Sequence, residues 1–315
     1  MPKSPRILVL GYNAWDVNLP VDAFPQQDTK CEVGDILMGG GGPGATAAVA
    51  LSRLGAQVRF VTQFGDDLAS ASQQAELKAA RVDLTLSRIA AGYDSPKAVI
   101  LVHPKTGERT IFWSRGDLPP LAVAEMNPDW IQDTDLFYTD GHDADAALVL
   151  AREARLCSVP VVMDAGSVRE GSAALIRQVT DAISSAGFAP ALTGCDNPSD
   201  ALRALHRRGP QQVAMTFGAR GVLALVADKV HHVAAFDVPV VDTTGAGDAF
   251  HAGYAFGRAC GREFLASLEY GSAVAALKCG RRGGRSGLPT EAEVAQLLKS
   301  GTRRVIPTDF IPILH

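Results

Sequence analysis

Residues 241–250 read Val-Asp-Thr-Thr-Gly-Ala-Gly-Asp-Ala-Phe, and this stretch is the best guide to the fold and its chemistry. The β-branched run Val238–Val241 predicts the end of a strand, and residues 242–244 predict a polar turn. Residues 245–257 combine small and aromatic side chains in a pattern that predicts a helix. The predicted order is therefore strand, turn and helix N-terminus.

The start of that predicted helix is a candidate anion site. The first amides of a helix have no acceptor within the helix and lie at the positive end of its dipole. The backbone N–H groups of Gly245, Ala246 and Gly247 can therefore hold a phosphate group. Asp248 lies in the first turn, where it can accept a proton from a substrate hydroxyl. These groups indicate phosphoryl transfer, and the alternative is that the Asp and Thr residues of this stretch only cap the helix.

The composition is typical of a soluble enzyme without a nucleic-acid surface. The chain has 315 residues, 47% hydrophobic and 20% charged, with a net charge of −4. We expect one α/β domain over residues 1–315, no nucleic-acid partner, no membrane segment and a cytoplasmic location. The cysteines lack the spacing of a disulfide framework or zinc site, so we expect reduced thiols at Cys31, Cys157, Cys195, Cys260 and Cys279.

Short apolar runs alternate with longer helical patterns along most of the chain. This alternation predicts a mostly parallel central sheet sandwiched by helices. The expected strands are Ile7–Leu10, Val58–Thr62, Leu136–Thr139 and Val159–Met163, and the expected helices are Gly44–Leu54, Ala69–Arg81 and Ala144–Cys157.

Two extended insertions, residues 14–38 and 94–115, interrupt the alternation. The second contains a predicted hairpin, formed by Ala98–His103 and Arg109–Trp113. We expect the two insertions to pair into a small separate sheet.

A glycine-rich segment, residues 38–46, allows two interpretations. Gly39, Gly41 and Gly44 satisfy the dinucleotide fingerprint G-x-G-x-x-G, with Asp66 or Asp67 at a suitable distance. A dinucleotide-binding turn should, however, follow the first strand of its unit, and this segment follows extended chain instead. The better interpretation is a backbone that approaches a polyol closely, with the Gly41 and Gly42 amides and Thr46 facing a sugar.

The 242–248 motif closely resembles the D-T-x-G-A-G-D signature of the ribokinase, or PfkB, family of carbohydrate kinases. The resemblance extends to the glycine-rich segment, to Thr216–Gly221 and to the loop at 280–284, and so covers nearly the whole chain. The closest likeness is to the ketohexokinase-like and sulfofructose kinase branch. It implies a ribokinase-like fold, with the two insertions forming a β-sheet lid over the sugar and a homodimer interface.

The resemblance also implies substrate-binding residues. Asp16 matches the acidic residue that binds two sugar hydroxyls, and Asp66 and Asp67 either contact ligand or cap the following helix. Arg115 is a candidate partner for a carboxylate or phosphate of the substrate, or else an exposed lid residue. His142 stands where the sulfofructose branch has a sulfonate-binding Arg, which counts against sulfosugar specificity.

On the nucleotide side, Thr216, Gly218 and Gly221 match the family segment that lines ATP, although a simple turn would also fit. No Walker A sequence occurs, and residues 188–197 lack the N-x-x-E glutamate that helps to organise magnesium in the family. Mg²⁺ is still expected, because it accompanies ATP.

Many members bind a monovalent cation beside the signature, and the resemblance implies K⁺ here. Its ligands would be the Asp242 side chain and backbone carbonyls, namely those of Thr244, Lys278, Arg281 and Gly283. The alternative is a loop whose arginines are merely exposed.

The sequence thus predicts an ATP-dependent sugar kinase, a phosphotransferase with an alcohol acceptor. The predicted acceptor is a hydroxyl of a small sugar or sugar acid, with a ketose-like substrate favoured. Asp248 would be the base, and Asp16 with the Gly41–Gly42 backbone would hold the sugar. A nucleoside kinase and a non-catalytic sugar or nucleotide sensor remain alternatives, and an NAD(P)-dependent oxidoreductase is the least favoured one.

Overall fold

The computed structural model describes residues 4–306, 308 and 310. Its centre is an eight-stranded sheet in the order β14-β13-β12-β11-β10-β9-β1-β4. The six strands from β12 to β4 are parallel to one another, and β13 pairs antiparallel with both β12 and β14. The strands are β1 (Arg6–Leu10), β4 (Gln57–Val61), β9 (Leu136–Thr139), β10 (Val161–Ala165), β11 (Asp181–Ser185), β12 (Gln212–Thr216), β13 (Val222–Val226) and β14 (Lys229–Val233). The predicted mostly parallel sheet is confirmed.

Helices cover both faces of this sheet because its strands carry apolar side chains on both. In β1, Ile7 and Val9 belong to one buried cluster and Leu8 and Leu10 to the other. The first cluster packs against α1 (Pro43–Arg53), α2 (Leu68–Ala79), α7 (Ala246–Ala259), α8 (Phe264–Lys278) and α9 (Glu291–Ser300). The second packs against α3 (Ala144–Leu156), α4 (Ser172–Leu175), α5 (Phe188–Thr193) and α6 (Pro198–His206).

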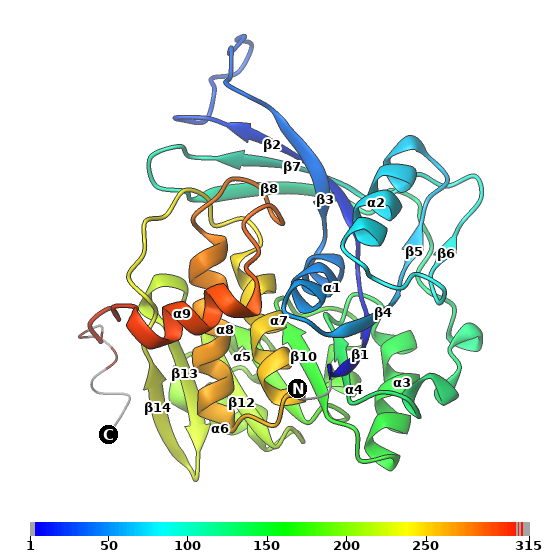
Figure 1. Ribbon diagram of the computed structural model, residues 1–315, viewed down its shortest axis with the longest axis vertical. Helices are drawn as coiled ribbons and strands as arrows, with labels where there is room; N and C mark the ends of the chain where they lie inside the picture. The colour runs from blue at the N-terminus through cyan, green and yellow to red at the C-terminus, as the bar shows by residue number, and fades with distance from the viewer. Residues whose placement is uncertain (1–3, 307, 309, 311–315) are drawn as a thin grey trace.

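The two insertions pair into a second sheet of four strands, in the order β3-β2-β7-β8, which stands at the top of Figure 1. Its strands are β2 (Ala14–Pro20), β3 (Leu37–Gly41), β7 (Lys97–Val102) and β8 (Arg109–Ser114). The predicted hairpin is β7–β8, and β2 pairs with β7 in parallel. The remaining elements are short. They are the strands β5 (Gln63–Phe64) and β6 (Arg88–Ile89) and the 3-10 helices η1 (Val123–Glu125), η2 (Pro128–Ile131) and η3 (Gly218–Arg220).

The strand predicted at Val238–Val241 is wrong. These residues belong to neither sheet, Val241 lies in a bend, and Val240 and Val241 are exposed. Pro239 has no N–H to donate to a sheet, and the Val241 N–H donates instead to the Cys279 carbonyl after α8. The signature is therefore held by a loop rather than by a strand.

The cysteines are free thiols, as expected. Within residues 4–306, 308 and 310, no helix has the length and apolar character that crossing a membrane requires.

Candidate active site

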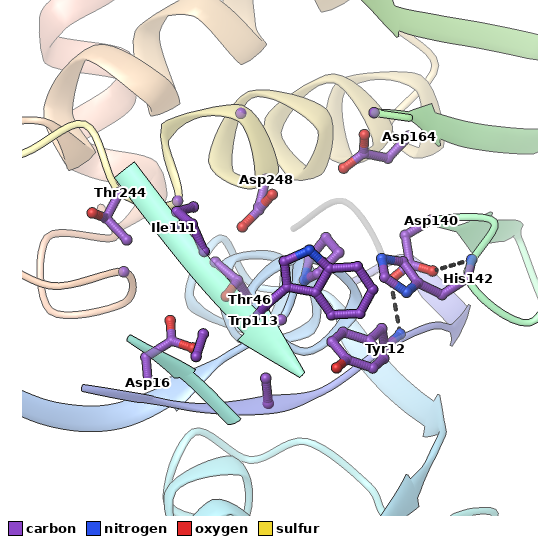
Figure 2. A pocket seen from close by; sticks show the side chains of 18 of the residues that line it. Tyr12, Asp16, Thr46, Ile111, Trp113, Asp140, His142, Asp164, Thr244 and Asp248 are labelled. Carbon is purple, nitrogen blue, oxygen red and sulfur yellow. Dashed lines mark hydrogen bonds between the residues drawn. The ribbon is translucent and has the colours of Figure 1, made fainter. Parts of the chain in front are cut away.

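A cavity of about 280 Å³ lies between the two sheets, at the carboxyl ends of β1, β9 and β10 and beside the start of α7. This is the edge at which parallel α/β sheets usually bind ligands. Figure 2 shows Asp248 and Asp164 on one side of the cavity, Asp16 and Tyr12 on another, and the Trp113 indole of β8 between them. The small sheet thus covers the end of the large one where the signature lies.

The start of α7 presents backbone amides to this cavity. Gly245 precedes the helix with a left-handed φ of 72°, and a Cβ there would lie 2.7 Å from the Gly284 carbonyl oxygen, so only glycine fits. Gly245 and Gly247 line the cavity as predicted. Ala246 does not line it, because its N–H closes a turn onto the Thr243 carbonyl at 3.1 Å. The Thr244 hydroxyl is buried without a hydrogen-bond partner among the described residues, and Thr244 lines the same space.

Asp248 lies where the sequence predicts, in the first turn of α7 and facing the cavity (Figure 2). Burial, together with the nearby Asp164 carboxyl group, raises its pKa to about 6, whereas His251 and Arg109 oppose the shift. A carboxylate of this pKa is ionised above neutrality and is a stronger base than an exposed aspartate. It is therefore suited to accept a proton near physiological pH.

Asp16 projects from β2 into the cavity and is 7% exposed. Burial raises its pKa to about 7, against the charge of Arg285. A Cβ on Gly41 would lie 2.1 Å from the Asp16 carboxyl group, so Gly41 leaves room for this side chain rather than lining the cavity. Gly42 and Thr46 do line the cavity.

Arg285, which the sequence analysis missed, organises this side of the cavity. Its buried guanidinium donates to the Gly41 carbonyl at 2.6 Å and to the Thr46 hydroxyl at 3.4 Å. Glu76 lies 3.5 Å from the guanidinium and also accepts the Gly40 N–H. No local pattern signals this role, because the partners are distant in sequence.

The other end of the cavity is aromatic. The Tyr12 and His142 rings stack with centroids 4.3 Å apart, and the Trp113 ring meets both edge to face. Asp140 holds the backbones of the two stacked residues, because its carboxylate accepts the N–H groups of Tyr12 and His142 at 2.8 and 3.0 Å. It also accepts the Gly44 N–H at 2.8 Å.

His142 lines the cavity as predicted, but Arg115 does not. Arg115 forms an ion pair with Asp143 at 3.1 Å and lies over the Tyr12 ring. Arg169, after β10, lines the cavity instead and was missed, as was Asp164 at the end of β10. The signal that could have found them is their position after a predicted parallel strand, because ligand sites form at that edge.

The predicted nucleotide residues run from Thr216, the last residue of β12, to Gly221 after η3, outside the cavity that holds Asp248. The Thr216 hydroxyl donates to the Ser184 carbonyl at 3.3 Å, and Gly218 begins η3 with a φ of 57°. Gly221 has a packing reason to be glycine, because a Cβ there would lie 2.3 Å from the Val233 carbonyl oxygen. In place of the family's N-x-x-E segment the chain forms α5, and Asn197 caps α6.

The signature and the loop after α8 meet at Asp242. Its carboxylate accepts the N–H groups of Thr244 and Gly283, both at 2.7 Å. The Lys278 side chain is buried, and its Nζ donates to the Asp242 carbonyl at 2.9 Å. Burial lowers the pKa of this amine, and the charge of Asp242 opposes the shift. Within the part of the chain that the structure describes, no group of three or more His, Cys, Asp or Glu side chains could hold a metal ion.

Two open alternatives are settled by geometry. Asp67 is the N-cap of α2 and accepts the Ser70 N–H, and Asp66 accepts the Gly92 N–H, so both carboxylates serve local structure. The glycine-rich segment follows β3 of the small sheet rather than a strand of the parallel sheet, which removes the context of a dinucleotide fingerprint.

Comparisons with known proteins agree with this architecture. The family model described as pfkB family carbohydrate kinase matches residues 4–291. The chain is 30% identical over 299 residues to the ATP-dependent ribose-1-phosphate kinase of Halopiger xanaduensis, covering 93% of this chain and 98% of the relative. It is 27% identical to the ribokinase of Haemophilus influenzae, covering 82% and 87% of the two chains.

Among solved structures, Arabidopsis thaliana ribokinase complexed with ribose and ATP superimposes with a TM-score of 0.82 at 21% identity, over 95% of this chain and all of the other. That likeness establishes the ribokinase-like fold. With the family match over almost the whole chain and the signature at the start of α7, the chain belongs to the pfkB family of carbohydrate kinases.

Proposed function

We propose that this kinase transfers the γ-phosphoryl group of ATP to a primary hydroxyl of a small sugar, with Asp248 as the general base. The observation that carries the proposal is the placement of the Asp248 carboxylate in one cavity with Asp16 and with the glycine amides at the start of α7. A base, a polyol-binding carboxylate and an anion site are the three groups that such a transfer needs.

Asp16 and its surroundings hold the sugar. No described residue donates a hydrogen bond to the Asp16 carboxylate, although the residue is buried, so two substrate hydroxyls can bond to it. Arg285 keeps Gly41 and Thr46 in place around it. Binding there orients the sugar, and Asp248 removes the proton of the attacking hydroxyl.

Gly245 and Gly247 line the cavity at the start of α7, so we assign their backbone amides to the phosphoryl group. Thr244 lines the same space, and its buried hydroxyl has no hydrogen-bond partner among the described residues. ATP supplies the phosphoryl group, and the Mg²⁺ that accompanies it neutralises charge on the β- and γ-phosphates. Thr216, Gly218 and Gly221 are the residues we assign to the rest of the nucleotide. Closure of the small sheet over the sugar would exclude water from the transfer.

We also propose a K⁺ site at the contact between the signature and the loop after α8. Asp242 already holds the two segments together, and the carbonyls of Thr244, Lys278, Arg281 and Gly283 would supply the remaining oxygens. Oxygen ligands of this kind suit a hard cation, and ordering this loop would order the adjacent amides of α7.

The small sheet exposes the apolar side chains of Met38, Val99 and Phe112, which supports the predicted homodimer through the lid. The free thiols and the use of ATP support the expected cytoplasmic location.

The test is coupled ADP release with and without K⁺, at constant ionic strength, against ribose, ribose 1-phosphate, fructose, sulfofructose, 2-keto-3-deoxygluconate and adenosine. We expect turnover that depends on one of these acceptors and on K⁺. Asp248→Asn should keep the fold and ATP binding and lose about 10²–10⁴-fold in kcat, the usual contribution of a general base. Near-normal turnover of Asp248→Asn would rule out that role, and ligand binding without ADP release from the wild type would indicate a sensor.

A nucleoside kinase is the second candidate, because the Tyr12, His142 and Trp113 rings could stack on a base. The volume of about 280 Å³ favours a monosaccharide, since it lies at the lower end for small-molecule sites. Adenosine in the acceptor panel decides between the two.

A further inference from the structure

Arg169 is a cavity-lining arginine with hydrogen-bonding capacity to spare. It is partly buried, and burial lowers its pKa, against the nearby charge of Asp140. Its Nη2 lies 2.9 Å from His142 Nε2, and its guanidinium lies over the Trp113 ring. Among the described residues, the one hydrogen bond of its side chain is that to His142, and no Asp or Glu forms an ion pair with it, so Nε and Nη1 are left to donate to a ligand.

His142 contributes a second donor at the same end of the cavity. Burial, together with the charges of Arg169 and Arg115, lowers its pKa to about 3, so the imidazole is neutral. An arginine can only donate, so Nε2 accepts from Arg169 and the ring proton lies on Nδ1. The ring therefore offers an N–H group that no described residue uses.

The Tyr12 hydroxyl is a third unused donor. It is buried without a hydrogen-bond partner among the described residues, and Tyr12 lines the cavity between Asp16 and His142 (Figure 2). Burial raises its pKa to about 12, so the phenol keeps its proton.

The carboxylates near this end are already occupied. Asp140 accepts three backbone N–H groups, and Asp143 forms an ion pair with Arg115. What remains is a set of donors without an acceptor, one of them a guanidinium partly removed from water. The planar guanidinium of Arg169 can donate to two oxygens of a carboxylate, phosphate or sulfonate at once. An anion bound there would offset the desolvation of Arg169.

We infer that the sugar substrate carries an anionic group, which Arg169 binds with help from His142 and Tyr12 at the end of the cavity away from Asp16. This inference rests on the proposed sugar kinase activity and specifies its substrate class. Arg169 is a specificity residue in this assignment: it selects an anionic sugar over the neutral one of the same size.

The experiment compares matched acceptors: ribose with ribose 1-phosphate, and fructose with 2-keto-3-deoxygluconate and with sulfofructose. The readouts are kcat/KM from ADP release and, independently of turnover, the rise in melting temperature that each compound produces. We expect at least one anionic compound to exceed its neutral partner by tenfold or more in kcat/KM. Which one does so identifies the group as phosphate, carboxylate or sulfonate.

Arg169→Gln should lower kcat/KM for the preferred anionic acceptor by about 10–100-fold, the scale of a charge-assisted bidentate contact, and leave the neutral partner within about threefold. Arg169→Lys should be intermediate, because it keeps the charge and loses the fork. Arg152→Gln, which removes an exposed arginine of α3, is the matched control and should change neither value.

Equal use of neutral and anionic sugars, or an equal loss on both in Arg169→Gln, overturns the inference and leaves the kinase assignment intact. If no acceptor releases ADP, the kinase assignment fails and the melting shifts still decide the inference. A shift with an anionic sugar that is lost in Arg169→Gln supports it, and the lack of any such shift overturns it.

Discussion

At the scale of residues, Asp164 is a buried carboxyl group whose ionisation is governed by its surroundings. Burial raises its pKa to about 8 and the Asp140 carboxyl group adds to the shift, while the Tyr138 hydroxyl, 3.3 Å away, opposes it. His251 Nδ1 lies 3.3 Å from the same oxygen, and burial lowers the pKa of this imidazole. At neutral pH the pair is therefore an uncharged carboxyl group and an uncharged imidazole.

We predict that Asp164→Asn stabilises the fold increasingly as the pH rises. Between about pH 4 and pH 8 the unfolded chain has lost this proton and the folded chain keeps it, so the wild type loses stability over that interval. Asn cannot ionise, so the variant does not lose stability over this pH interval through residue 164. The gain in free energy of unfolding should be near zero at pH 4 and about 1–3 kcal/mol at pH 8.

Urea denaturation of both proteins at pH 4.5, 6 and 8 measures this gain. Asp83→Asn, at an exposed aspartate, is the control and should show no such trend. A gain for Asp164→Asn that is equal at all three pH values would contradict the buried neutral carboxyl group.

The residues predicted from sequence are those whose chemistry is local. Asp248 and Gly247 belong to the first turn of a helix, where free amides and a short side chain follow from chain direction alone. Arg169 and Arg285 were missed because their partners come from other segments: Arg285 bonds to a carbonyl 244 positions away. Arg115 was expected to face the substrate, but Asp143 holds it outside the cavity wall.

At the scale of elements, the end of β3 shows how a glycine positions another residue's side chain. Gly41→Ala would place a Cβ 2.1 Å from the Asp16 carboxyl group, so Asp16 must rotate away from the cavity. We predict a loss of about tenfold or more in kcat/KM for the sugar, expressed mainly in KM, with ATP binding unchanged.

Gly39→Ala in the same strand is the matched variant, because a Cβ at Gly39 has no neighbour within 4 Å. Steady-state kinetics of the two variants, with circular dichroism to confirm folding, make the comparison. If Gly39→Ala were impaired as strongly as Gly41→Ala, the effect would belong to strand propensity and not to Asp16.

The sequence predicted the helices and strands best where apolar residues recur with a regular period along the chain. The predicted helix Ala144–Cys157 matches α3, which ends at Leu156, and the predicted hairpin matches β7 and β8 to within a residue or two. The strand predicted at Val238–Val241 is wrong because β-branched residues favour extended backbone but do not supply a neighbouring strand to pair with. Pairing is decided by what lies beside the segment, which was the end of α8.

At the scale of the whole molecule, the small sheet has an apolar outer face. The register places Met38, Val17, Val99 and Phe112 in one row across its four strands. Met38, Val99 and Phe112 are 66%, 39% and 52% exposed. On the opposite face Ala98, Ile100 and Val102 are buried, and Ala98 and Ile100 line the cavity. An exposed row of this kind is typical of an interface, which supports the proposed homodimer.

We therefore predict that Val99→Lys converts a dimer into a monomer. A buried unpaired ammonium opposes association, and the dissociation constant should rise at least tenfold. Leu156→Lys, at an apolar residue of α3 that is 80% exposed, is the control and should leave the association unchanged. Sedimentation velocity at micromolar concentration measures both, and a wild type that sediments as a monomer would contradict the proposed dimer.

The sequence by itself determined the family, the alternation of strands and helices, and the signature at the start of α7, because these depend on periodicity and on residues adjacent in the chain. Only the tertiary structure decided which charged groups meet in the cavity and which are neutral there. Burial and long-range contacts set the pKa values of Asp16, Asp164 and His142, and among the described residues they give Arg169 a histidine and no carboxylate as its partner. Those quantities arise from segments that are brought together only by folding, so no local pattern records them.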